Sequence, residues 1–226
     1  MKTINYSVVI AALFLFITSC KKNEDPATIY LGYDYFPVNV GHELYYDADS
    51  IITDEFTSTT RTHHFQIKEV IASTFLDNEG RTTERIERYV RDSSNAPWGI
   101  FKVSSVTLTN TRVERYDDNV RYVKLVFPVK HDVHWNGNSL NTLEALDYQY
   151  TDANSAMTLN NQPFDSVLTV LQQDVTDLIE RKYFLEQYAT RVGMIYKENI
   201  NQSIDFNLQT VKGGYIYKET LTSYTP

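Results

Sequence analysis

The sequence predicts a mainly β protein built from an antiparallel sheet, and two patterns along the chain support this prediction. Runs rich in β-branched and aromatic residues, several of them alternating polar and apolar, are typical of half-buried strands. These runs are 64–68, 102–109, 121–127, 166–171 and 215–218. Residues typical of turns separate them at 77–80, 117–119, 136–138 and 212–214. Since such short connections cannot hold a crossover between parallel strands, successive strands are expected to pair as a meander.

Little helix is expected. The stretches 141–150 and 174–188 contain the Leu, Glu and Gln residues that helices favour. Residues 180–185, however, show no apolar stripe at a 3.6-residue period. The C-terminal half of the second stretch is therefore predicted to be a strand that leads into Gly193.

The only cysteine, Cys20, ends an N-terminal segment typical of export. A cationic start precedes an apolar run of about ten residues, which is too short to span a bilayer but suits a signal peptide. The closing residues 17–20 (ITSC) resemble a bacterial lipobox, which implies that Cys20 is lipidated and becomes the new N-terminus. If the cysteine were incidental to an ordinary secretory signal, a secreted chain would carry one unpaired thiol. The predicted organisation is a signal peptide (1–19), a lipidated tether (20–28) and one β-rich domain (29–226).

The residues after Cys20 bear on location. No aspartate follows the cysteine directly, so the usual inner-membrane retention residue is missing. Glu24 and Asp25 resemble the acidic export signal of surface lipoproteins in Bacteroidota. We therefore expect an outer-membrane protein attached through lipid at Cys20, with the cell surface favoured over the periplasmic face and both left open.

Net charge narrows the range of partners. The chain carries a formal charge of −8, whereas a nucleic-acid partner would need clustered Lys and Arg. No polybasic patch for anionic lipid is visible either. The membrane through Cys20, an apolar ligand, a glycan or an envelope protein are the expected partners.

Several motifs in the predicted domain resemble those of uncharacterised envelope lipoproteins of Bacteroidota. They are YFP-x-x-x-G at 35–41, ERYVR at 87–91 with Trp98, KLVFP at 124–128, WNGN at 135–138 and YATRVGMIYKE at 188–198. The chain departs from this pattern at Arg191, where such proteins often have glycine. The resemblance implies a β-rich lipoprotein with a curved antiparallel sheet or an open half-barrel, like lipoprotein carriers. It implies no particular chemistry.

One cluster has the composition of a metal site. His131, Asp132 and His134 offer imidazole and carboxylate, which suit zinc. Residues i and i+3 of a strand point to opposite faces, so the two histidines converge only if the segment turns. Because no third ligand is designated, no metal or other cofactor is assigned, and a metal-dependent hydrolase is the weakest functional hypothesis.

No motif for nucleophilic catalysis is present. The sequence has no G-x-S-x-G elbow and no phosphate-binding glycine loop, and the lone cysteine is assigned to the anchor. We therefore assign no catalytic residue and expect a protein that is not an enzyme.

Aromatic residues suggest one alternative site. The chain has 17 tyrosines, and Trp98 and Trp135 each lie near a turn. Aromatic rings beside Asn and Asp can form a platform for sugars, although tyrosine also simply favours pleated, half-buried surfaces. Trp98 and Trp135 are therefore candidate ligand contacts.

The charged stretch 81–91 has two interpretations. Alternation places Glu84, Ile86, Arg88 and Val90 on one face of a strand. Ion pairing on a solvated face is the ordinary interpretation, and an anion-binding groove inside a curved sheet is the alternative.

The leading hypothesis from the sequence is a membrane-anchored, non-enzymatic binding domain whose concave face takes an apolar ligand or a partner protein. A surface glycan-binding module and a structural component of an outer-membrane complex are the alternatives.

Overall fold

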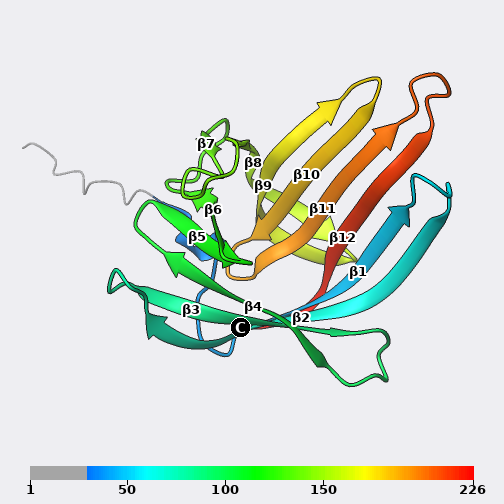
Figure 1. Cartoon of the computed structure of the whole chain (residues 1–226). Coiled ribbons are helices and arrows are strands. Elements are labelled where there is room, and N and C mark those ends of the chain that lie inside the picture. The colour runs from blue at the N-terminus through cyan, green and yellow to red at the C-terminus, as the bar shows by residue number, and fades with distance from the viewer. Residues whose placement is uncertain (1–29) are drawn as a thin grey trace, which may run out of the picture. The chain divides into compact units, whose positions relative to one another are not determined.

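The computed structural model describes residues 30–226, and in this part of the chain a single twelve-stranded antiparallel sheet dominates (Figure 1). The predicted signal peptide and Cys20 lie outside the described residues. A short 3₁₀ turn, η2 (Tyr33–Tyr35), precedes the first strand. The strands are β1 (Glu43–Thr53), β2 (Thr60–Leu76), β3 (Thr82–Arg91), β4 (Gly99–Leu108), β5 (Arg112–Asp117), β6 (Val120–Val126), β7 (His134–Asn136), β8 (Asp147–Leu159), β9 (Gln162–Thr176), β10 (Glu180–Ala189), β11 (Gly193–Ile204) and β12 (Val211–Thr225).

The strands follow one another around the sheet in chain order. The spatial order runs from β6 back to β1, continues through β12, and then runs back from β11 to β7. β1 and β12 pair directly, with Tyr46 opposite Leu221, so the first and last strands lie side by side. The sheet curls into a nearly closed half-barrel whose edge strands are β6 and β7 (Figure 1). The predicted mainly β fold, with a curved antiparallel sheet, is confirmed.

The two stretches with helix-like composition are not helical. Residues 141–146 form a loop before β8, and residues 174–188 span the end of β9, a turn and β10. The prediction of a strand leading into Gly193 is confirmed. Among residues 30–226, no helix is long and apolar enough to cross a bilayer.

The turn between β10 and β11 forms although residue 191 is arginine and not glycine. Arg191 itself adopts the left-handed conformation with φ of 64°, and Gly193 follows with φ of 98°. The backbone N–H of Arg191 donates to Asp34 O at 2.6 Å. This contact with the segment before β1 holds the turn in a conformation that non-glycine residues adopt rarely.

The YFP motif fills one end of the half-barrel. Tyr35 is fully buried, and its hydroxyl lies 2.9 Å from Asn154 Oδ1 and 2.7 Å from Ser166 Oγ. The ring of Phe36 packs against Tyr188, with centroids 6.1 Å apart. The segment before β1 therefore joins the core and ties β8 and β9 together.

The seam between β6 and β7 is closed without a strand ladder. Trp135 Nε1 donates to Val123 O at 2.9 Å, and Val123 N donates to Gly137 O at 2.9 Å. Tyr150 contributes a hydroxyl that donates to Val126 O and accepts from Val126 N, both at 2.8 Å. The WNGN motif and Tyr150 thus complete the barrel wall through a backbone hydrogen bond and side-chain contacts.

Candidate functional site

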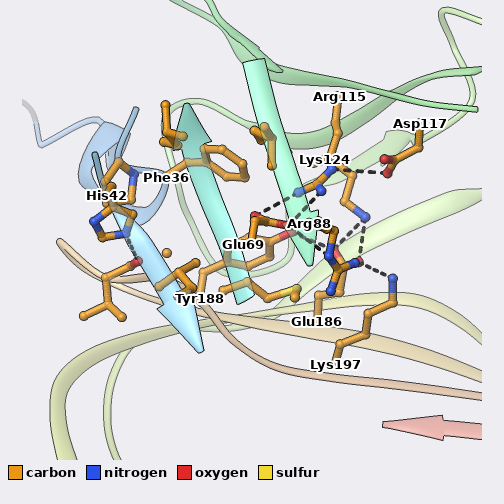
Figure 2. A pocket seen from close by; sticks show the side chains of 17 residues that line it. Phe36, His42, Glu69, Arg88, Arg115, Asp117, Lys124, Glu186, Tyr188 and Lys197 are labelled. Carbon is orange, nitrogen blue, oxygen red and sulfur yellow. Dashed lines mark hydrogen bonds and ion pairs between the residues drawn. The ribbon is translucent and has the colours of Figure 1, made fainter. Parts of the chain in front are cut away.

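The concave face of the sheet contains two adjacent regions of opposite character. The first, named here the interior charge cluster, consists of eight ionisable side chains that converge inside the half-barrel, all of which except Glu219 are labelled in Figure 2. They are Glu69, Arg88, Arg115, Asp117, Lys124, Glu186, Lys197 and Glu219. Strand alternation places each of them on the inner face, beside core residues such as Ile71 and Ile86.

One half of the cluster is centred on Glu69. Arg115 holds this carboxylate with two hydrogen bonds, Nη2 to Oε2 at 2.9 Å and Nη1 to Oε1 at 3.3 Å. Arg88 lies between Glu69 and Glu219, with Nη2 donating to Glu219 Oε2 at 2.6 Å. Tyr217 donates its hydroxyl to the other oxygen of Glu219 at 2.6 Å. β2, β3, β5 and β12 are therefore joined through the interior.

The other half is centred on Glu186, which is 2% exposed. Lys124 of β6 donates to Glu186 at 2.7 Å, and Tyr188 donates its hydroxyl to the same carboxylate at 2.6 Å. Lys197 lies 3.6 Å from Glu186 Oε1. The contact between Lys124 and Glu186 links the β6 edge of the sheet to β10, across the side on which the ladder is interrupted (Figure 2).

Neighbouring bases lower the pKa values of three acids of the cluster, Glu69, Asp117 and Glu186. Burial alone would raise the pKa of Glu186, but Lys124 and Lys197 outweigh it and lower the pKa to about 2. Burial opposes ionisation of Asp117 as well, yet Arg115 and Lys102 lower its pKa to about 2. The cluster therefore consists of charged groups held by one another, with four acids facing four bases.

The space left inside the cluster is small. The enclosed volume is about 50 Å³, which is room for water or one small ion rather than an acyl chain. Three buried polar atoms of the cluster have no hydrogen-bond partner, namely Arg88 Nε, Arg115 Nε and Asp117 Oδ1. Each of these atoms instead lies 3.2 to 3.4 Å from an oppositely charged group: Arg88 Nε from Glu69, Arg115 Nε from Asp117, and Asp117 Oδ1 from Lys102.

The second region, named the mouth groove, lies further along the same face, towards the β1–β2 hairpin. It is an open groove of about 600 Å³, within the range of ligand pockets. Its large apolar and aromatic walls come from Ile52, Phe56, Tyr215 and Tyr217. Tyr217 stands two residues from Glu219 on one strand, so groove and cluster share a face.

The β1–β2 hairpin leans over β12 to form one wall of the mouth groove. A Cβ atom at Gly213 would lie 2.9 Å from Glu55 Cβ, and Lys212 Nζ pairs with Glu55 Oε1 at 2.6 Å. Phe56, at the end of this hairpin, is 96% exposed, and Ile52 is 54% exposed. Apolar side chains therefore face solvent where the groove opens.

The two tryptophans proposed as ligand contacts lie in different surroundings. Trp98 packs on the outer side of the sheet, with Arg91 4.3 Å from its ring centroid and Tyr45 at 6.2 Å. Trp135 is a seam residue whose ring lies 4.6 Å from that of Tyr150. The structure does not bring the two rings into contact with each other, and neither lines the mouth groove.

The histidines of the predicted metal cluster are exposed and take separate partners. His131 Nδ1 lies 3.3 Å from Asp132, whereas His134 Nδ1 lies 2.8 Å from Asp147 Oδ2. Within the described part of the chain, no group of three or more His, Cys, Asp or Glu side chains is placed to hold a metal ion.

The alternation in residues 81–91 correctly predicts that Arg88 and Ile86 share one face of a strand. The favoured interpretation of these charges was ion pairing on a solvent-exposed face. That interpretation is wrong for Arg88, which is largely buried and pairs with Glu219, 131 residues away. Pairing over such a separation depends on β1 and β12 lying together, which no local pattern signals. The mouth groove was not predicted either. The sequence does contain an apolar signal there, because Ile51 and Ile52 precede an acidic turn and Phe56 follows it.

No protein-family model matches the chain, and no curated protein matches it. A solved structure from Bacteroides fragilis, described as an exported protein with a YmcC-like fold, is similar with a TM-score of 0.38 and 9% identity. A lipoprotein structure from Parabacteroides distasonis gives a TM-score of 0.37 and 8% identity. Each match covers 84% of this chain and 98% of the other. Similarity at this level carries no argument about function.

Proposed function

We propose that this protein is a non-enzymatic binding domain, lipid-anchored at Cys20 in the outer membrane, that holds an apolar ligand or the apolar part of a partner in the mouth groove. The observation that supports the proposal is the difference between the interior of the concave face and its mouth groove. The interior pocket of about 50 Å³ lies among paired charges and buried apolar side chains, whereas Ile52 and Phe56 stay exposed beside a groove of about 600 Å³.

The chemistry of the groove supports an apolar ligand. Ile52 and Phe56 provide aliphatic and aromatic area, and Tyr215 and Tyr217 add rings that can contact a chain or a ring system. Burying apolar surface contributes about 25 cal/mol per Å², so even partial coverage of these side chains by a ligand is favourable. Ser50, which lies opposite Tyr217, adds a polar group that can orient a ligand.

Binding of an apolar fluorescent probe tests the proposal. N-phenyl-1-naphthylamine fluoresces strongly in an apolar site, and we expect the wild-type chain to bind it saturably. Ile52→Asp places a charge in the groove wall and is expected to weaken binding by about tenfold or more. Ile52 is half-exposed, so the variant should stay folded.

The matched control is Leu76→Asp. Leu76 is 71% exposed at the other end of β2, far along the strand from the groove. Probe affinity equal to that of wild type is expected for this variant. If both variants bind like wild type, or if wild type shows no saturable binding, the proposed function is wrong.

The aromatic platform has less support as a binding site. Arg91 and Lys68 already lie over the ring of Trp98, and the Trp135 indole N–H is used in the seam. A sugar would have to displace these contacts before stacking on either ring.

A further inference from the structure

The mouth groove has acidic side chains at its outer end. Asp54 and Glu55, in the β1–β2 hairpin, line the groove, and among the described residues no Lys or Arg side chain lines it. Glu55 is paired with Lys212 at 2.6 Å, whereas Asp54 Oδ1 accepts two backbone N–H groups of its own turn, at 2.8 and 3.0 Å. A negatively charged part of a ligand is therefore disfavoured at this end of the groove.

A base lies just beyond the inner end of the groove. Tyr217 and Asn199 line this end, and they lie opposite each other on β12 and β11. One row further into the half-barrel, Lys197 lies opposite Glu219 on the same face of the sheet. Two residues of a strand span about 7 Å, so a ligand that fills the groove can extend to the Lys197 ammonium group. The Lys197 side chain is 23% exposed.

Lys197 is the most weakly held base of the interior charge cluster (Figure 2). Glu186 accepts hydrogen bonds from Lys124 at 2.7 Å and from Tyr188 at 2.6 Å. Lys197 Nζ stays 3.6 Å from Glu186 Oε1, and its side chain makes no hydrogen bond within residues 30–226. The three other bases of the cluster each donate a hydrogen bond of 2.6 to 2.9 Å. The Lys197 ammonium group therefore has donors left for an acceptor that a ligand brings.

The acids beside Lys197 already have partners of their own. Arg88 and Tyr217 each donate a hydrogen bond of 2.6 Å to Glu219, and Glu186 has the two donors given above. The charges of both acids are therefore offset inside the cluster. An anionic group of a ligand at this position would meet a base that lacks a hydrogen bond and acids that do not need that base.

The space beside Lys197 limits the size of such an anionic group. Lys197 also lines the interior pocket, whose volume is about 50 Å³. This volume has room for a group the size of a small ion. A carboxylate fits this limit, whereas a phosphodiester headgroup or a sugar is larger. The apolar and aromatic walls of the groove suit a hydrocarbon chain attached to the carboxylate.

Arg61 is the other base near the groove. It lies opposite Ile52 on β2, at the rim of the same face, and it is exposed. Attraction between exposed charges is screened by water and salt, whereas a partly buried pair is screened less. Lys197 is therefore the better partner for a carboxylate.

We infer that the ligand of the mouth groove is a single-chain carboxylate, such as a long-chain fatty acid, with its carboxylate at Lys197. Its chain lies along Tyr217, Tyr215 and Ile52 towards Phe56. This inference rests on the proposed function, and it adds the chemical class of the ligand and its direction in the groove.

Two fluorescent ligands that differ in the charge of one end test this inference. Dansylaminoundecanoic acid and its methyl ester share the same chain and fluorophore, so the ratio of their dissociation constants measures what the carboxylate contributes. At about pH 7 the acid is ionised, and we expect the wild-type chain to bind it about tenfold more tightly than the ester. A ratio near one in the wild type would overturn the inference, whatever the variants do.

The variant Lys197→Gln should abolish this preference. We expect it to bind the acid about tenfold more weakly than wild type and to bind the ester within about twofold of wild type, which also shows that the groove is intact. Lys197→Arg keeps the positive charge and should keep the preference for the acid. An unchanged preference in folded Lys197→Gln would overturn the inference.

The matched control is Arg61→Gln, which removes a base from the rim of the same face. Its preference for the acid should stay within about twofold of that of wild type, because Arg61 is exposed. Loss of the preference in Arg61→Gln would place the carboxylate at the rim and would overturn the inference.

This inference and the proposed function fail in different ways. Saturable binding of the ester and of N-phenyl-1-naphthylamine, without a preference for the acid, would overturn the inference and leave the proposed function intact. If none of the three ligands binds saturably, the proposed function is wrong, and the inference that rests on it is wrong as well.

Discussion

The interior charge cluster and the mouth groove lie on one concave face, but the cluster buries charged side chains whereas the groove exposes apolar ones. The cluster buries charges, among them Glu186 and Glu219 at 2% and 0% exposure, while the groove exposes Ile52 and Phe56. In the cluster each acid is satisfied by a base, so the region can hold its shape without a ligand. In the groove the apolar surface has no counterpart in the described domain. This difference is the basis of the proposal that the charged interior is structural and that the mouth groove binds a ligand.

The largest expected change in the free energy of unfolding comes from a substitution in the interior charge cluster. Glu186→Gln leaves Lys124 buried without its carboxylate, and breaking a buried pair by removing one partner costs about 3–5 kcal/mol. Urea unfolding followed by circular dichroism measures this loss.

The matched control for that variant is Glu180→Gln. Glu180 pairs with Lys182 at the surface, with side chains about one-third exposed, and a change below about 1 kcal/mol is expected. Equal losses in the two variants would contradict a structural role for the cluster.

Acid should weaken the fold through the same residues. The folded-state pKa values of Glu186 and Asp117 are both about 2, below their ordinary values of 4.5 and 3.8. Their stabilisation is therefore complete above about pH 5 and is lost as pH falls towards 2, by about 3 kcal/mol for Glu186. The free energy of unfolding measured between pH 7 and 3 should fall less steeply in Glu186→Gln. A slope identical to that of wild type would exclude Glu186 as a source of the acid sensitivity.

A smaller effect is expected at the seam. A Cβ atom at Gly137 would lie 2.5 Å from the Tyr148 ring, so Gly137→Ala should destabilise the fold by about 1–3 kcal/mol. Gly80→Ala is the comparison, because Gly80 has φ of 74° but nothing within 4 Å of its Cβ position. Thermal unfolding of the two variants compares crowding at the seam, which only Gly137→Ala introduces, with the backbone strain of a positive φ, which only Gly80→Ala introduces. A loss no larger in Gly137→Ala than in Gly80→Ala would argue against tight closure there.

The sequence predicted the fold class well because local patterns carry it. Alternation and turn residues marked most strands, and the strand leading into Gly193 was predicted although its composition resembled a helix. The motifs that resemble those of envelope lipoproteins have structural roles in this fold. Tyr35 fills one end, Lys124 pairs with Glu186, and Trp135 closes the seam.

The site was harder to predict because it depends on contacts between distant segments. Arg88 finds Glu219 only after β1 and β12 pair. Ile52 and Phe56 are exposed because the curved sheet ends beside them. The spacing of residues in the sequence does not show where the sheet ends. Trp98 and Trp135 were candidate ligand contacts because they are aromatic and lie near turns. In the structure the indole N–H of Trp135 is used in a hydrogen bond at the seam.

The most direct test of the account measures both regions in one series: probe affinity and the free energy of unfolding for wild type, Ile52→Asp and Glu186→Gln, at a temperature where all three are folded. The account predicts that Ile52→Asp loses probe affinity by about tenfold with stability nearly unchanged, while Glu186→Gln loses about 3–5 kcal/mol of stability with affinity nearly unchanged. Loss of probe affinity in folded Glu186→Gln, with Ile52→Asp still binding, would place the binding site in the interior and contradict the account.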